Sequence, residues 1–482
     1  MAKTSGARIA RRALIAGMIS LPANPVLADD LRQALVMAYN TNPTLQAARA
    51  QQRAVDEGVP ITRSAGLPSV SGTATYSEFI DSSTSNPLSP QRNLDASLNF
   101  GMPVYAGGGI RNSINAARTR VTAGQADLRG VESGVFSQVV SSYMDVILAE
   151  AVVRLNRANV QRLEVNLQAT RDRFEIGDLT RTDVAQSASR LALAQGQTRS
   201  AQASLIAARE RYIQVVGKAP EGLSTPPALQ GLPESADDAV AVALNSNPDL
   251  LAARERSKAA GFDTAASNAK RLPQVSVFAS SGYNDFLGSN RIPGAIQSTT
   301  DTTVGVRTTV PLFQGGLPSA QKRQAQARES AALEQEIGIE RTVIAAVRSA
   351  YAQWQAAQSL TVSSQTAVDA AMLSLEGVRA ENTVGNRTIL DILNAENELL
   401  NAQVQLVTAK RNAYVAGFNL LAAMGKAEAR DLGLEGGPLY DPEINARRAR
   451  NSIWDWNDNP KPTPVSTRTV DSKAQDGSVA GE

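Results

Sequence analysis

The chain repeats its own pattern once, and this duplication constrains its fold more than any other feature of the sequence. Asn42-Pro43 returns as Asn247-Pro248, 205 residues later. Further matched pairs, separated by 205 or 208 residues, are Leu67-Pro68 and Leu272-Pro273, Tyr143 and Tyr351, Gly177 and Gly385, Asp183 and Asp391, and Gly217-Lys218 and Gly425-Lys426. A repeat of this length is too long for one solenoid unit and predicts two equivalent architectural halves that meet the same geometric constraint.

Composition argues against most enzyme classes. The chain has no cysteine and no histidine, which removes disulfides, thiol nucleophiles, imidazole bases and the usual zinc ligands. Carboxylate and hydroxyl chemistry remain open, but no clustered catalytic set is present in the sequence. Gly217-Lys218 lacks the upstream glycine of a phosphate-binding loop, and the 107–109 glycine run suits a bend between a strand and a helix. We therefore expect no enzyme activity and no cofactor.

The first residues resemble a secretory signal peptide. Basic residues precede an apolar run at 13–21, and Val26-Leu27-Ala28 forms a small-residue cleavage pattern before Asp29. The run is too short for an uncleaved anchor, and the Arg11-Arg12 pair is only a weak sign of twin-arginine export. Removing residues 1–28 takes four basic residues from the 48 of the chain and leaves 44 against 46 acidic residues, a net charge of −2. This balance does not suggest nucleic-acid binding.

Four short segments alternate between apolar and polar residues, the period of two that is typical of β-strands. We predict strands at 68–80, 94–104, 273–286 and 301–312. In the last segment Val304 and Val306 alternate with Gly305 and Arg307, whereas Phe278 interrupts the polar face of the third. Strands of about ten residues cross a bilayer when tilted. The alternative interpretation is two hairpins of a soluble sandwich.

Two further observations favour strands that span a membrane. No stretch after the signal peptide approaches the ~18 uncharged apolar residues of a spanning helix, so a membrane segment must be built from strands. Aromatic residues also gather near the strand ends, as in the girdles of a membrane barrel. They are Tyr76, Phe79, Tyr283 and Phe286 at one end and Tyr105 and Phe313 at the other.

The rest of each half is predicted to be helical and unusually long. Proline is absent between Pro103 and Pro220 and between Pro318 and Pro438, although ordinary domains are interrupted more often. We predict long helices at 111–173, 181–216, 318–382 and 388–424. Apolar residues recur every seven positions, which favours coiled-coil-like packing. The series are Val139, Val146, Val153, Val160 and Leu167; Val347, Trp354, Thr361, Val368 and Leu375; and Leu393, Leu400, Val407, Tyr414 and Leu421.

These patterns divide the chain into five regions. Residues 1–28 are the signal peptide, 29–222 the first repeat, 223–235 a proline-rich linker, 236–434 the second repeat, and 435–482 a C-terminal tail. Each repeat is expected to open with one shorter helix, at about 31–63 and 236–270. We expect the tail to lack helical pattern and to be partly disordered.

Four strands cannot close a membrane barrel, because known barrels begin at about eight strands. An open sheet edge in lipid would leave backbone groups without hydrogen bonds, at several kcal/mol each. A chain whose strands span the membrane must therefore oligomerise. This argument gives a multiple of four strands and does not choose between a dimer and a trimer.

The chain resembles the TolC family of outer-membrane efflux and type I secretion ducts along almost its whole mature length. The resemblance rests on the duplicated layout, on the segments Pro-Val-Tyr-Ala-Gly-Gly from Pro103 and Pro-Leu-Phe-Gln-Gly-Gly from Pro311, and on Val-Gly-Asn-Arg-Thr-Ile-Leu-Asp-Ile-Leu-Asn-Ala-Glu from Val384. It implies an α+β membrane protein with four transmembrane β-strands per chain. It further implies a homotrimer with a shared 12-stranded β-barrel that continues into a periplasmic α-helical barrel.

The resemblance also implies a gate at the periplasmic tips of the helices. Arg387 matches the arginine that pairs with an aspartate on a neighbouring inner helix, here Asp183, with Thr182 beside it. Asp391 follows Arg387 by four residues, and we expect it on the same helix face, where three copies would form a carboxylate ring that favours cations. The alternative is that these residues are ordinary solvated surface charges.

The tip turns match the place where the family meets its periplasmic adaptor. They comprise Gly177, Asp178, Leu179, Gly385 and Asn386, although such glycines are more often simple helix C-caps. Two positions depart from the family pattern. Asn394 replaces an acidic residue and Asn382 an aromatic one, which predicts a weaker cation site and a weaker latch.

The function implied is a passive outer-membrane exit duct of a tripartite export system. Its expected partners are a periplasmic adaptor protein, an inner-membrane transporter of the ABC or RND type, and outer-membrane lipid. The sequence from Leu390 to Leu400 looks closer to type I secretion ducts than to drug-efflux ducts. The alternative function, from a different class, is a soluble periplasmic coiled-coil scaffold with β-hairpin caps.

Overall fold

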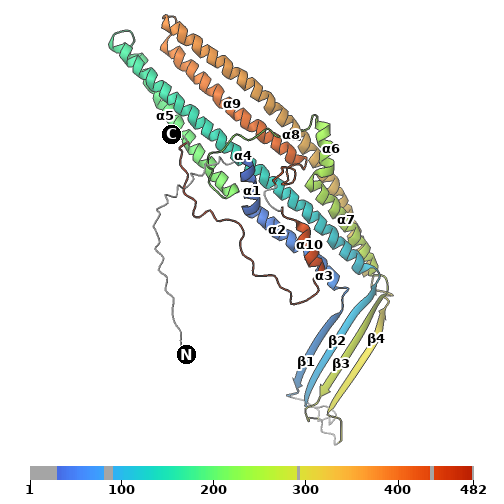
Figure 1. Ribbon diagram of the computed structural model, residues 1–482. Helices are drawn as coiled ribbons and strands as arrows, with labels where there is room; N and C mark the ends of the chain where they lie inside the picture. The colour runs from blue at the N-terminus through green and yellow to red at the C-terminus, as the bar shows by residue number, and fades with distance from the viewer. Residues whose placement is uncertain (1–29, 81–90, 290–293, 435–438, 480–482) are drawn as a thin grey trace, which may run out of the picture.

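The chain folds into an elongated molecule with a β-sheet at one end and two long helical hairpins that reach the other (Figure 1). This computed structural model describes residues 30–80, 91–289, 294–434 and 439–479. The predicted signal peptide lies outside the described residues. The two halves of the sequence contribute two strands and one long hairpin each, so the duplication appears directly in the architecture.

One antiparallel sheet contains the four strands, in the order β1-β2-β3-β4. They are β1 (Ser69–Glu78), β2 (Arg92–Ala106), β3 (Gln274–Asp285) and β4 (Ser298–Thr309). Residues opposite one another share a chemistry, as in the apolar row Val70, Phe100, Ala279 and Val304 and the adjacent polar row Ser71, Asn99, Ser280 and Thr303. The sheet therefore has one apolar and one polar face, as strand alternation requires.

Two prolines mark irregularities in the sheet, one just beyond the end of β4 and one inside β2. β4 begins and ends three residues before the predicted segment, and Pro311 lies two residues beyond its end. Proline lacks the N–H that a strand needs to continue its ladder. β2 passes its own Pro103 through an irregularity in the pairing between Pro103 and Tyr105, as β-bulges allow.

Phe278, which interrupts the polar face of β3, packs over a glycine of the neighbouring strand β4. It lies opposite Gly101 on β2 and Gly305 on β4. A Cβ atom at position 305 would lie 2.9 Å from the Phe278 ring, so a larger residue there would require the ring to shift. The ring also lies 4.7 Å from the Arg307 guanidinium carbon, within the range of a cation–π contact. The aromatic residue on the polar face is thus a packing device between strands.

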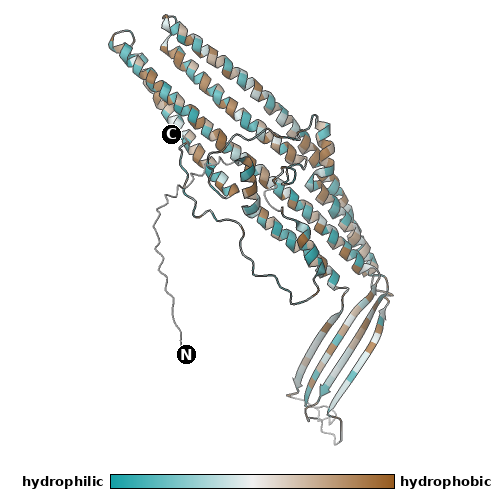
Figure 2. Cartoon of the chain, in the orientation of Figure 1, coloured by the Kyte–Doolittle hydropathy of each residue, from teal (hydrophilic) through white to brown (hydrophobic). Residues whose placement is uncertain are grey.

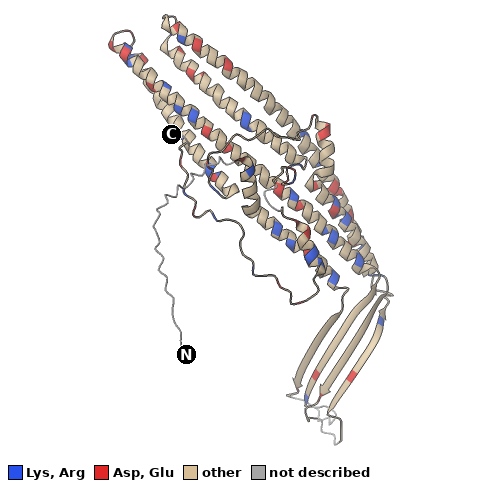
Figure 3. Ribbon diagram, in the orientation of Figure 1, with Lys and Arg blue, Asp and Glu red and all other residues tan. Residues whose placement is uncertain are grey.

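Among the residues that the structure describes, none covers the apolar face of the sheet. Its large side chains, such as Leu98, Val304 and Val306, are more than half exposed. Charged residues are sparse in the sheet compared with the helices (Figure 3), and the three in the strand interiors, Asp95, Asp301 and Arg307, lie in rows of the polar face. A soluble sandwich would bury the apolar face, so this arrangement requires an apolar surrounding.

Two helical hairpins of nearly identical dimensions form the rest of each half. The first arms are α4 (Gly109–Glu175) and α8 (Leu317–Thr383), each of 67 residues, or about 100 Å at 1.5 Å per residue. The return arms are α5 (Arg181–Val216) and α9 (Ile389–Ala423). None of the residues in the three seven-residue series is exposed, and hydrophobic and hydrophilic residues alternate along the long helices (Figure 2). The predicted coiled-coil-like packing is confirmed.

The shorter helix at the start of each half is broken, where the sequence suggested one continuous helix. The first is α1 (Leu31–Thr41), α2 (Pro43–Asp56) and α3 (Gly58–Ser64), and the second is α6 (Ala236–Ser246) and α7 (Pro248–Ala269). Asn42 and Asn247 end one helix and cap the next, with proline at its first position. Their side chains also donate hydrogen bonds of 2.9 Å to Val215 and Ala423, near the ends of α5 and α9. The repeated Asn-Pro pair is therefore a duplicated joint.

One described helix, α4, is long and apolar enough to cross a membrane by length and composition alone. The expectation that no stretch approaches that limit is therefore wrong. Its largest apolar side chains, including Phe136, Val139 and Tyr143, are fully buried in the main core with residues of α1, α5 and α9. The apolar content of α4 thus serves packing between helices.

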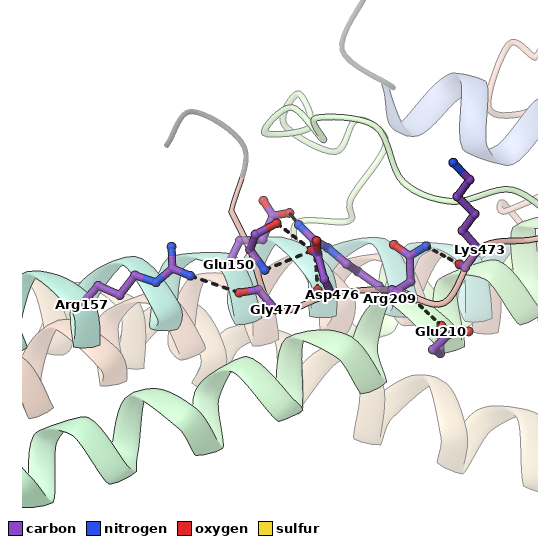
Figure 4. Close-up of polar contacts among 9 residues, drawn as sticks. Glu150, Arg157, Arg209, Glu210, Lys473, Asp476 and Gly477 are labelled. Atoms are coloured by element: carbon purple, nitrogen blue, oxygen red, sulfur yellow. Dashed lines mark hydrogen bonds and ion pairs between the residues drawn. The ribbon is translucent and has the colours of Figure 1, made fainter.

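The C-terminal tail is more ordered than its composition suggested. It forms a helix, α10 (Pro442–Asn451), which the sequence analysis missed, and then an extended segment that packs across α4 and α5. Arg209 on α5 donates hydrogen bonds to Glu150 on α4 at 2.9 Å and to the Asp476 carbonyl oxygen at 3.0 Å (Figure 4). Val479 is buried in the main core. A polar segment is held here by specific charge-assisted hydrogen bonds.

Candidate functional site at the helical tips

The two hairpins end in turns with the same backbone geometry. Gly177 and Gly385 each follow the C-cap residue with φ of +83°, a left-handed conformation that favours glycine. The next backbone N–H reaches back to the helix, from Asp178 to the Arg173 carbonyl oxygen and from Asn386 to the Glu381 carbonyl oxygen, both at 2.9 Å. These hydrogen bonds are those of a Schellman C-cap. The predicted tip residues therefore lie on two exposed, rigid turns.

An ion pair crosses each turn, and the two ion pairs have opposite polarity. In the first turn Arg173 pairs with Asp178 at 2.7 Å, and in the second Glu381 pairs with Arg387 at 2.7 Å. Positions 173 and 381 correspond in the repeat, so a basic residue in one copy matches an acidic residue in the other. The Glu381 carboxylate raises the pKa of Arg387. Each turn is closed locally, but only the second has an arginine between its glycine and the N-cap threonine.

Identical capping boxes start the return helices. The Thr180 and Thr388 hydroxyls accept from the backbone N–H groups of Asp183 and Asp391, and each carboxylate accepts from its threonine's backbone N–H. Hydrogen bonds from the Thr180 hydroxyl and backbone lower the pKa of Asp183. Those from the Thr388 backbone and hydroxyl lower the pKa of Asp391. Both aspartates are therefore charged at neutral pH and stabilise the first turn of their helices.

The predicted latch partners are not joined within one chain. Within the described part of the chain, Arg387 pairs with Glu381, and Asp183 accepts hydrogen bonds from Thr180. Thr182 is exposed in the first turn of α5. Arg387 precedes the N-cap Thr388, so the expectation that it shares a helix face with Asp391 is wrong. The capping box starts α9 at Ile389, after that arginine.

Asn382, at the position where the resembling family has an aromatic residue, closes the second turn. Its side-chain amide donates a hydrogen bond of 2.7 Å to the Arg387 carbonyl oxygen. The matching residue of the first turn is Phe174, which is exposed. The amide thus fixes the backbone that carries Arg387, a role that the sequence comparison with the family did not suggest.

A buried carboxylate below the tips was missed by the sequence analysis. The Glu396 side chain is 1% exposed and accepts hydrogen bonds from Arg379 on α8 at 2.8 Å and from Asn166 on α4 at 3.0 Å. It therefore links both arms of the second hairpin to the first hairpin. The signal was present in the sequence, since Glu396 lies three residues after Leu393, at a position where a seven-residue series places apolar side chains.

A second polar contact joins the hairpins at the same level. Arg190 on α5 donates a hydrogen bond of 2.9 Å to the Asn394 side-chain oxygen on α9. Asn394 is the residue that departs from the acidic family pattern. Beside it, Leu163, Ala194 and Leu393 form a small apolar cluster between α4, α5 and α9. The hairpins are thus held together below their tips by a few defined contacts, while the tips stay free.

The described residues contain no group of three or more acidic side chains that could hold a metal ion. The chemistry of the tips is that of exchangeable ion pairs and capped helix ends.

Comparison with known proteins identifies the same architecture. The family described as "Outer membrane efflux protein" matches residues 34–218 and 239–426, one match for each repeat. The outer membrane efflux protein BepC of Brucella suis is 33% identical over 92% of this chain and 95% of its own length. The alkaline protease secretion protein AprF of Pseudomonas aeruginosa is 27% identical over 86% of this chain and 88% of its own.

Solved structures share the fold at lower sequence identity. The Vibrio cholerae outer membrane protein VceC has a TM-score of 0.69 at 22% identity, covering 82% of this chain and 96% of its own. The Campylobacter jejuni CmeC outer membrane channel has a TM-score of 0.72 at 15% identity, covering 87% of this chain and 89% of its own.

Proposed function

The chain belongs to the outer membrane efflux protein family, and from this premise we propose how its copies assemble and open as an exit duct. Proteins of this family are channels of the Gram-negative outer membrane that extend into the periplasm, and this chain is one of them. The family match does not favour the alternative of a soluble periplasmic scaffold.

We propose a homotrimer, and the observation that carries it is the open, uncovered sheet. β1 and β4 are the outer strands, so within the described part of the chain each has one edge without a partner, and the apolar face is exposed. Pairing β4 of one copy with β1 of the next satisfies both edges and places the apolar face against lipid. Three copies give the 12-stranded barrel implied by the resemblance to the TolC family.

The duct would be passive and would take its energy from an inner-membrane transporter. A periplasmic adaptor would engage the exposed turns that contain Gly177, Asp178, Leu179, Gly385 and Asn386. The relatives include a protease secretion protein, AprF, and a cobalt-zinc-cadmium resistance protein, CzcC. Both an ABC-driven secretion system and an RND-driven efflux system are therefore reasonable settings. The Leu390 to Leu400 segment favours type I protein secretion.

The gate would work by exchange of ion-pair partners at the tips. In the closed trimer Arg387 would leave Glu381 and pair with Asp183 of a neighbouring hairpin, with Thr182 beside that contact. All these groups are substantially exposed, and exposed ion pairs contribute little net stability. The exchange therefore costs little, and adaptor binding at the turns could reverse it. Asn382 would hold the Arg387 backbone in position for either partner.

Asp391 would form a ring of three carboxylates inside the closed tip. Its capping hydrogen bonds keep it charged at neutral pH. Three carboxylates around a narrow passage favour cations and can bind one that blocks conduction. The amide of Asn394, bound to Arg190, adds no charge to this ring.

Conductance in planar bilayers tests the proposed gate. Arg387→Ala should raise conductance above that of the wild type, and Asp391→Ala should abolish block by a divalent cation. Unchanged conductance in the first variant would remove Arg387 from the latch. Unchanged block in the second would remove Asp391 from the cation site.

A further inference from the structure

Two of the three tryptophans of the chain lie in one exposed turn of the C-terminal tail. Residues 452–457, here called the tryptophan turn, follow α10 directly. Trp454 is 73% exposed and Trp456 is 84% exposed, and the neighbouring Ile453 is 69% exposed. Such a concentration of exposed apolar area in a chain with only 4% aromatic residues marks an interaction surface.

The tryptophan turn is held in place at both ends. The Asn457 backbone N–H donates to the Trp454 carbonyl oxygen at 3.3 Å, which closes the turn. Arg448 on α10 donates to the Asn459 side-chain oxygen at 2.6 Å and so ties the outgoing chain back to the helix. Farther along, Asp476 and Gly477 are bound to α5 and α4 (Figure 4). The turn is therefore presented at a defined place.

That place is the boundary between the helices and the sheet. α10 advances beside the opening helices through three hydrogen bonds, from Tyr440 to Tyr39 at 2.8 Å, from Asn445 to Asp56 at 2.7 Å, and from Arg63 to the Arg450 carbonyl oxygen at 2.5 Å. The residue numbers of both segments rise together along this series, so α10 runs parallel to the opening helices and points toward the sheet. Arg63 precedes the first residue of β1 by only six positions. Figure 1 shows the segment after α10 turning back near the level at which the strands begin.

We propose that the tryptophan turn is an interfacial anchor that inserts its two indole rings among the phospholipid headgroups of the periplasmic leaflet. The proposal rests on the membrane placement of the sheet, with which this surface is continuous. Indole rings prefer the membrane–water interface, because they combine an apolar body with an N–H donor. Asp455 lies between the two tryptophans, and its charge keeps the turn at headgroup depth, outside the hydrocarbon core. Ile61 on α3, also exposed, extends the apolar surface at this level.

Quenching by brominated phospholipid tests the anchor. The full-length Trp354→Phe variant retains only Trp454 and Trp456 as tryptophan fluorophores. It is reconstituted into vesicles of phosphatidylcholine or of phosphatidylcholine brominated near the top of the acyl chains. We expect about a twofold loss of emission in the brominated vesicles, because rings at the interface lie within reach of the bromines.

The Trp454→Phe/Trp456→Phe variant is the matched control. Its remaining Trp354 lies 37 residues along α8 from Leu317, about 55 Å from the sheet end, and should not be quenched. Flotation with the vesicles shows separately whether the sheet is inserted, and failure to float would overturn the membrane placement itself. In floated protein, unquenched tryptophans that iodide reaches would overturn the anchor in favour of a hydrated turn. Unquenched tryptophans that iodide does not reach would overturn it in favour of contact with another copy.

Discussion

The two hairpin tips share one backbone design and differ in their charges. Both have a glycine at φ +83°, a Schellman turn and a Thr-x-x-Asp capping box. The first turn places its arginine before the glycine, at Arg173, and the second places it after, at Arg387. The residues that the two turns share set the shape of a tip, and the residues that differ decide which charges the tip presents.

The hairpins also differ below the tips. The second carries Glu396, buried against Arg379 and Asn166, whereas the matching residue of the first is Ala188. At this position, therefore, only the second hairpin contributes a buried carboxylate that accepts a hydrogen bond from the other hairpin of the same chain. We propose that the second hairpin is the one that moves, because its turn presents Arg387 and its buried contact at Glu396 can be released.

Glu396→Ala should have the largest effect, because it makes the second hairpin resemble the first. The substitution leaves Arg379 and Asn166 without their acceptor, and we expect a loss of about 1–3 kcal/mol in stability together with higher conductance. The measurements are the apparent thermal unfolding midpoint of the trimer and its single-channel conductance.

Glu398→Ala is the control for this variant, because Glu398 lies two residues later on the same helix and is exposed. It should change neither quantity. A Glu396→Ala channel with wild-type stability and conductance would show that the two hairpins do not differ in this respect.

Thr388→Ala and Thr180→Ala should have equal and intermediate effects on their helices. Each removes one half of a capping box, at a cost of about 1 kcal/mol. Hydrogen exchange should speed up in the first turn of α9 or α5, respectively. Conductance should rise only in Thr388→Ala, and a rise of the same size in Thr180→Ala would contradict the assignment of the second hairpin as the moving one.

An exchange of charges at the second tip should leave stability unchanged while it opens the gate. The double variant Glu381→Arg/Arg387→Glu keeps a local ion pair but presents a carboxylate where Asp183 of a neighbouring hairpin needs a cation. Like charges at that contact repel, so conductance should exceed that of the wild type.

The reverse exchange at the first tip, Arg173→Asp/Asp178→Arg, should behave as wild type. If the exchange at the second tip also conducts as wild type, the local ion pair is sufficient and the latch between hairpins is absent.

Lowering the pH should have the smallest effect, and only in the acid range. The pKa of both capping aspartates is lowered from 3.8, so their contribution to the caps is present above that value and is lost as the pH falls through the lower folded pKa. Cation block by Asp391 should therefore persist from pH 7 to about 5. Block that is already lost at about pH 5 would mean that repulsion among three carboxylates outweighs the capping hydrogen bonds.

The sequence predicted the regular parts of this fold well, because long periodic signals are redundant. The strand alternation and the sevenfold series, from Val139 to Leu421, each rest on many residues, so one exception such as Phe278 does not hide them. The Asn-Pro joints were visible as repeats, but their role as helix breaks depended on one capping side chain. α10 was missed because its mostly polar sequence is stabilised by contacts with Asp56 and Arg63, about 390 residues away in the chain.

The location of the candidate site could be predicted from the sequence, but most of its contacts could not. The family resemblance located both tips, while the pairing of Arg387 with Glu381 and the burial of Glu396 follow from three-dimensional proximity. The position of Arg387 before the N-cap depended on the competition between a helical turn and a capping box. Sequence spacing alone does not decide between them, because the residues from Thr388 to Asp391 can form either a helical turn or a capping box.

Disulfide cross-linking across the proposed seam between copies tests the central claim most directly. The chain has no cysteine, so a cysteine pair can be added without background. Ser71→Cys on β1 is combined in turn with Asp301→Cys or Thr303→Cys on the same face of β4. Oxidation of the membrane-embedded protein should give covalent dimers and trimers and no larger species. Closure of the barrel by three copies would be contradicted by chains that remain monomeric with every cysteine pair. It would also be contradicted by cross-linked species that stop at dimers or continue beyond trimers.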